Sequence, residues 1–586
     1  MIDAGSEAKR VLPLTLRLGL HAAAVTTALK DAEHAKVTER IWNHDAALWK
    51  DDEAHQKIIR NSLGWLTVAG EMLEVVDDLR VFAEEIAAAG FQQAMVCGMG
   101  GSSLCPEVLR QTFGKQQNFP ELLVLDSTDP DTVDAFNQKI DLESCLFIIA
   151  SKSGTTTEPI AFHRYWYDEV SRVSDLPGHS FVTITDPGSQ MAETAAAEDF
   201  RKIILNQPTI GGRYSALSYF GMVPAALMGL DVSTLLKQAN HMAQACGASA
   251  QLEENPGAIL GAVMAECALA GRDKLTIVTD EKVAALGLWI EQLIAESTGK
   301  EGKGIVPVVG EPLGDVAIYA DDRLFVSVSV GPLSEETSAR LKRLEAAGHP
   351  VVYRNLPDVY HLGAEFFLWE FATAFAGWRL GINPFDQPNV QESKDATRQL
   401  LEKFKRDGKL EEQKPLAADD QITLFGAPDA GSGSVSDVLR GFCAKIKPGD
   451  YVALLAYIQE TPGADAGLAG IRTSISNTTR CATTMGYGPR YLHSTGQLHK
   501  GGPDSGVFIE ITSADRVDPH VPGEPYTFGV LKDAQALGDF QSLEKHGRRA
   551  LRVDLGNDDV GGLRKLEQII SNVLSELGRA GASPPS

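Results

Sequence analysis

The chain has 586 residues, a formal net charge of −24 at pH 7, and 44% hydrophobic and 23% charged residues. This acidity argues against nucleic-acid and anionic-membrane binding, because both depend on clustered Lys and Arg, and no stretch approaches the ~20 consecutive apolar residues of a membrane helix. We therefore expect a soluble, cytoplasmic protein, and the length predicts two or more domains rather than one hydrophobic core.

The first region, residues 1–60, has a sequence typical of amphipathic helices. Trp42, Trp49 and, just beyond the region, Trp65 are the expected packing anchors, and a partner-binding surface is the alternative interpretation. Residues 61–250 then alternate short apolar runs with helical segments, and the runs lie at 94–99, 122–125, 146–150 and 181–185. Alternation of this kind predicts a parallel sheet with helices on both faces.

A second series of strands and helices occupies residues 251–400, with apolar runs at 275–279, 324–330 and 351–353. Residues 401–437 run from a charged helix into the segment GAPDAGSGS, and we expect them to form a linker or an insertion. Further strands are expected at 451–458 and 506–512, within residues 438–540, and residues 541–586 are expected to form a C-terminal strand, a helix and a tail. The sequence therefore predicts an α/β fold with mainly parallel sheets flanked by helices.

Seven cysteines are scattered along the chain, are odd in number and lack CxxC spacing. This pattern predicts neither a disulfide framework nor a structural zinc site. We expect buried free thiols at all seven positions, which are Cys97, Cys105, Cys145, Cys246, Cys267, Cys443 and Cys481.

Two loops that follow predicted strands combine glycines with hydroxyl side chains. In VCGMGGSS, residues 96–103, backbone N–H groups at the glycines can approach an oxyanion closely, although such a turn on its own is as often purely structural. In SKSGTTTEP, residues 151–159, hydroxyls, a lysine and a glycine gather at a strand-to-helix junction. That density of donors favours a phosphate, and the lack of a nucleotide-type P-loop pattern favours a monoester over ATP. A Ser/Thr-rich helix cap without a ligand is the alternative.

Two further segments carry candidate acid–base chemistry. The paired glycines of GGRYSALS, residues 211–218, would let Arg213 enter a cleft and stabilise a developing enediolate, whereas a structural ion pair is the default for an isolated arginine. Gln292 and Glu296 are four residues apart and so share one face of a predicted helix. The apolar neighbour Trp289 indicates partial burial, which would suit Glu296 to proton abstraction, whereas a solvated surface carboxylate is the usual alternative.

Four segments in order, SKSGTTTEP, GGRYSALS, QLIAESTGK and GINPFDQPNVQESK, resemble the signature segments of the glucose-6-phosphate isomerase family, which is built from two sugar-isomerase (SIS) domains. The resemblance covers roughly residues 60 to 530. It implies that residues 61–250 form the first SIS domain with the phosphate loop, that 251–400 begin the second, and that 438–540 are the displaced part of the second. It also implies interconversion of glucose 6-phosphate and fructose 6-phosphate through a cis-enediolate, without a metal or an organic cofactor, and favours a homodimer.

The resemblance also assigns roles to individual residues. Glu296 would be the base that moves a proton between C1 and C2, Arg213 would stabilise the enediolate, Gln292 would contact the substrate, and Lys394 is the lysine that closes the NPFDQ segment. The residues that would hold the phosphate are Gly101, Ser102, Ser151, Lys152, Ser153, Thr155 and Thr156.

The family's ring-opening histidine is displaced in this chain. No histidine in the thirty residues after Glu296 can fill that role, whereas RYLHSTGQLHKGG, which begins at residue 490, resembles the family's histidine segment but lies beyond Lys394. We assign the role to His493. This order of segments resembles the isomerase part of fused transaldolase/glucose-6-phosphate isomerase proteins, although no segment resembles a transaldolase. His361 is the alternative because it precedes Lys394, and His499 is a weaker one.

Two other classes of function stay open from the sequence. SIS domains also occur in amidotransferases that make glucosamine 6-phosphate, but those need an N-terminal cysteine nucleophile, which Met1-Ile2-Asp3 does not provide. A non-catalytic SIS sensor of sugar phosphates needs the phosphate loop alone, and the presence of Glu296 and Arg213 together with Lys394 argues against it.

Overall fold

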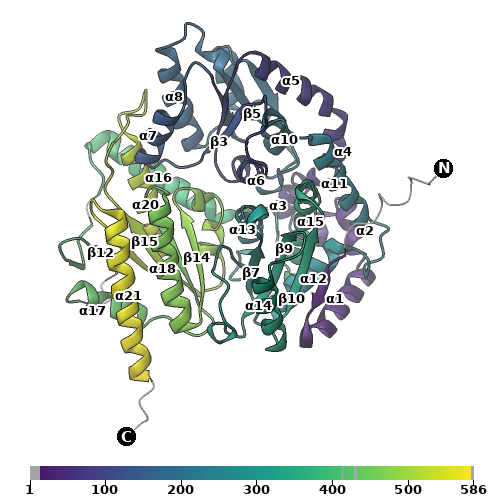
Figure 1. Ribbon diagram of the computed structural model, residues 1–586, viewed down its shortest axis with the longest axis vertical. Coiled ribbons are helices and arrows are strands. Elements are labelled where there is room, and N and C mark those ends of the chain that lie inside the picture. The colour runs from purple at the N-terminus through teal and green to yellow at the C-terminus, as the bar shows by residue number, and fades with distance from the viewer. Residues whose placement is uncertain (1–12, 412, 428–431, 582–586) are drawn as a thin grey trace. The chain divides into compact units, whose positions relative to one another are not determined.

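The computed structural model describes residues 13–411, 413–427 and 432–581. The chain divides into two compact units, each assembled from several stretches of sequence, and Figure 1 colours these stretches by residue number. Unit 1 contains Met1–Leu125, Asp141–Thr298 and Leu324–Asp386, and unit 2 contains Asp126–Ile140, Gly299–Arg323 and Gln387–Ser586.

Unit 1 begins with a short strand and a series of helices. β1 (Thr15–Arg17) pairs antiparallel with β10 (Val351–Leu356), so the N-terminal region, expected to be helical, contains a strand; residues 1–12 of that region lie outside the described residues. The sequence pattern does not predict this strand because it is only three residues long and its partner is more than three hundred residues away. The helices that follow are α1 (Ala22–His34), α2 (Val37–Trp42), α3 (Glu53–Arg60), α4 (Trp65–Glu74) and α5 (Val76–Ala88).

The three tryptophans expected to anchor this region do so. Trp42 Nε1 donates to the carbonyl of Cys246 at 2.8 Å, and Trp49 Nε1 donates to the carbonyl of Ala374 at 2.9 Å. Trp65 is fully buried and stacks on Tyr214, with ring centroids 5.4 Å apart. Each indole therefore fixes a part of the chain between residues 42 and 65 to the rest of unit 1.

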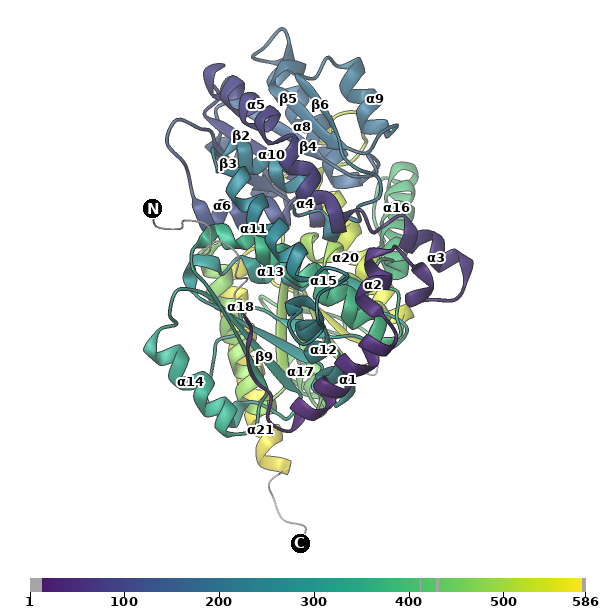
Figure 2. The ribbon, with the colours of Figure 1, turned by 90° about the vertical axis from the view of Figure 1, so that its right-hand side faces the viewer.

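The first sheet of unit 1 is wholly parallel, as the alternation of short apolar runs and helices predicts. Its strands are β2 (Gln93–Gly98), β3 (Glu121–Leu125), β4 (Cys145–Ala150), β5 (Phe181–Thr185) and β6 (Lys202–Leu205), in the order β3-β2-β4-β5-β6. The order reverses between β2 and β4, and in sheets of this kind a ligand crevice forms outside the carboxyl ends of the strands at that point. The helices α6 (Leu104–Phe113), α8 (Thr157–Ser171) and α9 (Gln190–Ala197) follow β2, β4 and β5, and α9 lies beside β5 and β6 (Figure 2).

A second sheet in unit 1 contains β1, β10, β9 (Arg323–Val330) and β7 (Lys274–Thr279), in that order, with β9 and β10 parallel. The helices of this part are α10 (Tyr219–Leu227), α11 (Val232–Ala245), α12 (Pro256–Leu269), α13 (Leu286–Thr298), α14 (Glu335–Ala346) and α15 (Leu362–Leu380). α15 packs against both α11 and α12 at very short range: a Cβ on Gly363 would lie 2.0 Å from the carbonyl oxygen of Leu235. α13 also packs against α15, so it lies in a closely packed, apolar environment.

Unit 2 contains one mixed sheet, in the order β11-β12-β16-β15-β13-β14. The four strands β13 (Tyr451–Tyr457), β14 (Ala482–Tyr487), β15 (Gly506–Thr512) and β16 (Arg549–Asp554) are parallel, and the order again reverses beside the first of them, between β13 and β15. β11 (Ala417–Ala418) and β12 (Thr423–Gly426) extend the sheet antiparallel. These two strands lie inside residues 401–437, the expected linker or insertion; residues 412 and 428–431 of that stretch are outside the described residues.

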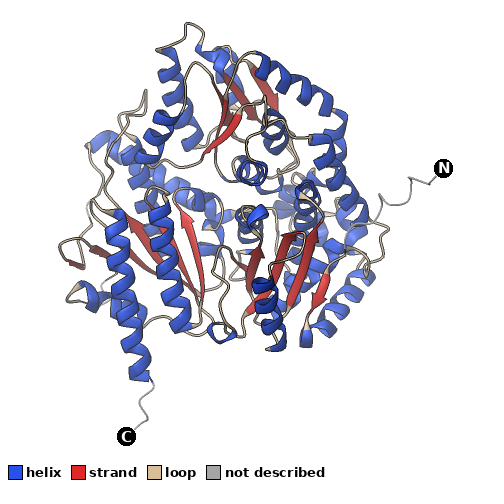
Figure 3. Ribbon diagram, viewed as in Figure 1, coloured by secondary structure: helices blue, strands red, loops and turns tan. Residues whose placement is uncertain are grey.

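Further helices and one further strand belong to unit 2, and Figure 3 shows the strands of this sheet flanked by helices. They are α7 (Pro130–Lys139), β8 (Val306–Val308), α16 (Pro388–Asp407), α17 (Val435–Cys443), α18 (Pro462–Thr479), α19 (Gly496–Gly501), α20 (Phe528–Lys545) and α21 (Asp559–Gly581). One sheet face is apolar and packs on α17, α18 and α21 through residues such as Leu454, Ile509 and Ile471. α18 and α21 run side by side there (Figure 1). The other face carries buried charge, including Glu510, whose pKa burial raises well above its ordinary value.

All seven cysteines are buried and free, as expected from their spacing. Burial raises the pKa of the Cys246 and Cys443 thiols to about 12, so these groups are protonated at neutral pH. Across residues 13–411, 413–427 and 432–581, no helix combines the length and apolar character needed to cross a membrane.

Candidate active site

The loop after β2 makes a close contact with the GGRYS segment. A Cβ on Gly101 would lie 1.9 Å from the carbonyl oxygen of Gly212, so only glycine allows the two backbones to meet here. The 3-10 helix η3 (Gly100–Ser102) forms this turn, with Gly100 in the left-handed region at φ 56°. Ser102 is 9% exposed at the end of the turn. The contact thus brings the glycine loop beside Arg213, more than one hundred residues further along the chain.

The loop after β4 presents the expected hydroxyl groups at the start of α8. Ser151 Oγ donates to Thr156 Oγ1 at 3.2 Å and accepts from the backbone N–H of Gly154, while Ser153 and Thr155 are exposed. Gly154 has φ 67°, which glycine adopts readily and which tightens the loop. Thr156 precedes α8 but its side chain does not cap the helix, so the N-terminus of α8 faces the loop without a side-chain acceptor. This is a geometry that binds anions.

Lys152 has a partner within unit 1. Its ammonium donates to Asp186 Oδ2 at 2.5 Å and to the carbonyl of Pro208 at 2.8 Å. Burial raises the pKa of Asp186, and the nearby ammonium opposes that shift. The structure therefore gives this lysine an internal carboxylate, and contact with a bound phosphate would require the ammonium to leave or share it.

Arg213 is held rigidly in a buried position. It is 3% exposed, its Nε donates to Ser297 Oγ at 2.7 Å, and its Nη2 donates to the carbonyls of Pro384 at 2.7 Å and Asp386 at 3.0 Å. The residue lies in the 3-10 helix η5 (Gly212–Tyr214), and its guanidinium lies over the Tyr214 ring at 5.7 Å. Neutral oxygens thus accept from Nε and Nη2, and Nη1 faces a carboxylate.

That anion is Glu296. Its Oε2 lies 3.5 Å from Arg213 Nη1 and accepts from Gln292 Nε2 at 3.4 Å. Glu296 and Gln292 are 7% and 3% exposed and lie one turn apart on α13, which the buried Trp289 fixes in the core. The structure therefore brings together three of the expected residues, Arg213, Gln292 and Glu296, around one carboxylate oxygen.

Two residues of this cluster escaped the sequence interpretation. Ser297 is fully buried and accepts from Arg213, and the Tyr214 hydroxyl lies 3.4 Å from the same Ser297 oxygen and 3.5 Å from the carbonyl of Pro384. Burial raises the pKa of Tyr214, while the adjacent Arg213 lowers it, so the phenol is neutral. Both residues stand next to predicted ones in GGRYS and AESTG, and that adjacency was the only available signal.

His361 lies in unit 1, and Lys394 and His493 lie in unit 2. His361 ends the 3-10 helix η8 (Val359–His361) before α15, and its Nδ1 is 3.0 Å from Asp358 Oδ1, the arrangement of a helix-start residue. Lys394 is exposed on α16. His493 is half-buried at the end of the 3-10 helix η10 (Arg490–His493). His499, on α19, is 2% exposed, and burial lowers its pKa well below the ordinary value, so it is a neutral core imidazole.

The turn that carries His493 is fixed by the side chains of the two residues at its start. The Arg490 guanidinium binds both oxygens of Asp126 at 2.9 Å, and the Tyr491 hydroxyl donates to Asp539 at 2.8 Å. Asp539 also accepts from Lys500 at 2.5 Å, with both side chains almost fully buried. Two anchored side chains at adjacent positions, Arg490 and Tyr491, leave this turn little freedom.

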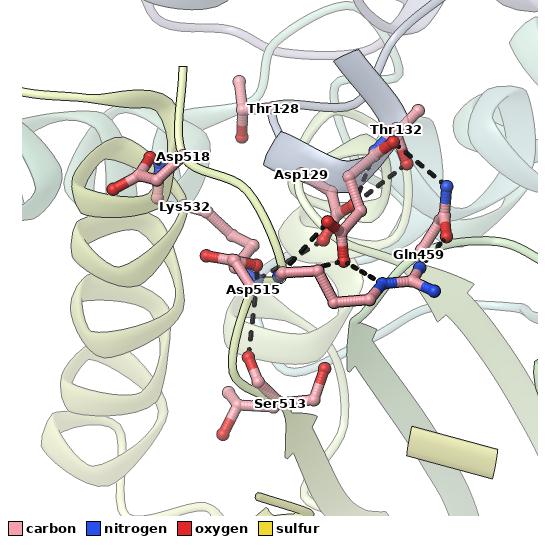
Figure 4. Close-up of polar contacts among 12 residues, drawn as sticks. Thr128, Asp129, Thr132, Gln459, Ser513, Asp515, Asp518 and Lys532 are labelled. Carbon is pink, nitrogen blue, oxygen red and sulfur yellow. Dashed lines mark hydrogen bonds and ion pairs between the residues drawn. The ribbon is translucent and has the colours of Figure 1, made fainter. Parts of the chain in front are cut away.

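The carboxyl edge of the sheet in unit 2 is filled by charged pairs (Figure 4). The Lys532 ammonium, with a side chain 1% exposed, lies between Asp129, at 3.3 Å, and Asp515. Arg516 Nε pairs with Asp131 at 3.0 Å. The aspartates of 126–140 thus neutralise cations that the loop after β15 and α20 provide. Among the described residues, no group of three or more His, Cys, Asp and Glu side chains could hold a metal ion.

Comparisons with known proteins show which proteins the chain resembles. Residues 39–307 match the family model described as phosphoglucose isomerase. A glucose-6-phosphate isomerase of Parabacteroides distasonis is 26% identical over 392 residues, which cover 58% of this chain and 87% of that protein. A glucose-6-phosphate isomerase of Rubrobacter xylanophilus is 28% identical over 364 residues, which cover 54% and 84%.

Among solved structures, a hypothetical protein from Thermus thermophilus matches with a TM-score of 0.55 and 24% identity, over 66% of this chain and 99% of that one. This likeness supports the fold. Unit 1 thus combines a parallel sheet, two loops with glycines and hydroxyl groups, and a buried Arg–Glu pair. Residues 39–307 are thus similar to the phosphoglucose isomerase family, and both isomerases align with more than half of the chain.

Proposed function

We propose that the protein interconverts glucose 6-phosphate and fructose 6-phosphate as an aldose-ketose isomerase. The observation that carries the proposal is the buried cluster of Glu296, Arg213 and Gln292, in a segment that matches the phosphoglucose isomerase family. Proton transfer next to a carbonyl requires a base and a fixed cation. Here the Glu296 carboxylate is the base, and Arg213 and Gln292 contact one of its oxygens.

In the proposed reaction, glucose 6-phosphate first opens its ring: the C1–O5 bond breaks, O5 takes a proton, and the O1 hydroxyl gives up a proton to form the C1 aldehyde. Glu296 then removes the proton from C2, and the negative charge develops on O1 of the cis-enediolate. Arg213 offsets that charge without reorganising, because Ser297 and two backbone carbonyls hold its guanidinium in place. Glu296 returns the proton to C1 while the O2 proton moves to O1, so the reaction gains and loses no atoms.

The phosphate is proposed to bind at the crevice between β2 and β4. Gly101 and Ser102 would supply one side, and the N-terminus of α8 with the hydroxyls of Ser151, Ser153, Thr155 and Thr156 the other. Parallel sheets bind ligands at this switch point, and anions are stabilised at helix N-termini. Lys152 would contribute positive charge from its position beside Asp186.

Ring opening is proposed for His493, with Lys394 as its partner and His361 as the alternative. The support for His493 is its place in a turn that Arg490 and Tyr491 fix through Asp126 and Asp539. A general acid has to be held in one orientation toward the proton that it transfers. A homodimer, a cytoplasmic location, the absence of a metal or cofactor requirement, and a relation to fused transaldolase proteins stay predictions from the sequence.

The test is conversion of fructose 6-phosphate to glucose 6-phosphate in buffer with EDTA, with Glu296→Gln in parallel. We expect wild-type turnover and a loss of about 10³-fold in the variant, because a positioned base contributes of that order. Glu291→Gln is the matched control, since Glu291 lies on the same helix and is also 7% exposed, and it should stay within a few-fold of wild type.

Retained turnover in Glu296→Gln would refute the base assignment. No turnover by the wild type, together with calorimetric binding of the sugar phosphate, would refute the isomerase and favour a sensor. His493→Asn and His361→Asn in the same assay, with ring opening followed separately, distinguish the two histidines, and normal ring opening in His493→Asn would shift the role to His361.

A further inference from the structure

One buried side chain in unit 2, Gln497, joins three segments that the proposed mechanism uses. It lies on α19 and is fully buried. Its Oε1 accepts from the backbone N–H of Asn389 at 2.8 Å. Its Nε2 donates to the backbone carbonyl of Gly299 at 2.9 Å and to Asn389 Oδ1 at 2.8 Å. One amide therefore makes three hydrogen bonds and uses both of its N–H groups.

Each of these partners stands a few residues from a group proposed to act on the substrate. Gly299 directly follows the last residue of α13 and is three residues after Glu296. Asn389 is three residues after Asp386, whose carbonyl accepts from Arg213, and it lies in the first turn of α16, the helix that carries Lys394. Gln497 itself is four residues after His493.

The atoms around this amide are closely packed. A Cβ on Gly501 would lie 2.5 Å from Asn389 Oδ1, 2.6 Å from Gln497 Nε2 and 2.9 Å from the carbonyl oxygen of Gly299, so the backbone at 501 seals the three hydrogen bonds. The N–H of Gly302 donates to the carbonyl of Gly501 at 3.0 Å and ties the same two segments a second time. In a close-packed interior, a side chain held this way transmits its position to its neighbours.

We propose that Gln497 is a positioning residue of the isomerase, which sets the segment that follows the base helix against the start of α16 and the histidine turn. The inference rests on the proposed function. Gln497 touches no reacting atom in this scheme; it acts by fixing the chain a few residues away from Glu296, Lys394 and His493. Misplacement of such groups by about 1 Å costs about 10²-fold in rate.

The variant that tests this is Gln497→Met, which keeps the length of the side chain and removes all three hydrogen bonds. Because the proposed phosphate loops lie on other segments, we expect kcat for fructose 6-phosphate to fall about 30-fold to 100-fold while KM changes less than about threefold. The primary isotope effect with fructose 6-phosphate deuterated at C1 should rise, since proton transfer becomes slower than the steps around it.

Gln535→Met is the matched control. Gln535 is 2% exposed in the same unit and accepts from Thr128 at 2.7 Å, so the substitution removes an equally buried amide. Both variants should lose thermal stability, but only Gln497→Met should lose kcat per folded molecule. If Gln497→Met does not fold, Asn389→Ala is the substitute, because it removes one of the three hydrogen bonds. Its fall in kcat should be about one tenth of that expected for Gln497→Met, again with little change in KM.

An unchanged kcat per folded molecule in the Gln497 variant, or an equal loss in Gln535→Met, overturns the inference and leaves the isomerase in place. No turnover by the wild type in the same assay overturns the proposed function and the inference with it.

Discussion

The carboxyl edges of the first sheet of unit 1 and of the sheet in unit 2 share one strand order but have opposite chemistry. In β3-β2-β4-β5 the chain order reverses between β2 and β4, and in β14-β13-β15-β16 it reverses between β13 and β15. Parallel sheets bind ligands at such a reversal. The edge in unit 1 carries glycines and hydroxyl groups, and its one lysine is paired with Asp186. The edge in unit 2 carries Lys532 and Arg516, paired with aspartates of the 126–140 segment (Figure 4).

The comparison shows that strand order alone does not determine whether a sheet edge can bind an anion; the side chains at the edge do. The strand order reverses at both edges, but in unit 2 the carboxylates of Asp129 and Asp131 already pair with the cations Lys532 and Arg516. In unit 1 the donors are backbone N–H groups and hydroxyls at the start of α8. We therefore expect one edge to bind substrate phosphate and the other to hold the fold together.

The largest expected effect comes from breaking the edge in unit 2. Lys532→Met leaves the buried Asp129 and the partly buried Asp515 without their cation, and the free energy of unfolding should fall by about 3–5 kcal/mol. Lys545→Met, on the exposed end of the same helix, should change the free energy of unfolding by less than about 0.5 kcal/mol. Denaturant titration measures both, and equal stabilities would show that the charged pairs carry no structural role.

A pH titration sharpens the same contrast. Burial raises the pKa of Asp515 to about 6, against the opposing effect of Lys532 and with the support of Asp129 and Asp533. Because this folded-state pKa lies above the unfolded value, the folded state binds more protons, and this group's contribution to stability falls as the pH rises from about 4 to about 6.

The Asp515→Asn variant should therefore gain stability relative to wild type over that pH window, by about 2 kcal/mol once solvent screening is allowed for. Unfolding free energies at about pH 4.5, 5.5 and 7 measure the difference. A difference that is flat with pH would contradict the raised pKa.

The smallest effect should come from the edge in unit 1. Thr156→Val removes one hydroxyl from the proposed phosphate loop, and KM for fructose 6-phosphate should rise about tenfold, because a hydrogen bond to a charged group is worth about 1.5–3 kcal/mol. Thr132→Val, at the edge in unit 2, removes a hydroxyl that bonds to Asp129 and should leave KM unchanged. If the two variants shifted KM equally, the assignment of the phosphate to unit 1 would be wrong.

The fold class was predictable from sequence because buried parallel strands are short apolar runs between helices, and β2, β4 and β5 follow that pattern closely. β11 and β12 were not, because strands of two and four residues at a sheet edge have no apolar run to detect. Nor could local pattern place 126–140 in unit 2, since its partners Arg490, Arg516 and Lys532 lie several hundred residues away.

The candidate site divides in the same way. Gln292 and Glu296 share a helix face, so their spacing alone predicted that they are neighbours. Their contact with Arg213 depends on the fold of unit 1, and only the family resemblance suggested it in advance. Tyr214 and Ser297 were missed because a buried phenol and hydroxyl carry no pattern of their own.

The 126–140 segment also constrains how the protein can be made. It leaves the ribosome long before the residues that pair with it: Asp126 precedes Arg490 by 364 positions, and Asp129 precedes Lys532 by 403. Synthesis proceeds at about 5–20 residues per second, and domains fold as units. These aspartates are therefore made tens of seconds before the arginine and the lysine that pair with them. Unit 2 is thus the last part to close, and a fragment that ends before α20 lacks the lysine that neutralises Asp129.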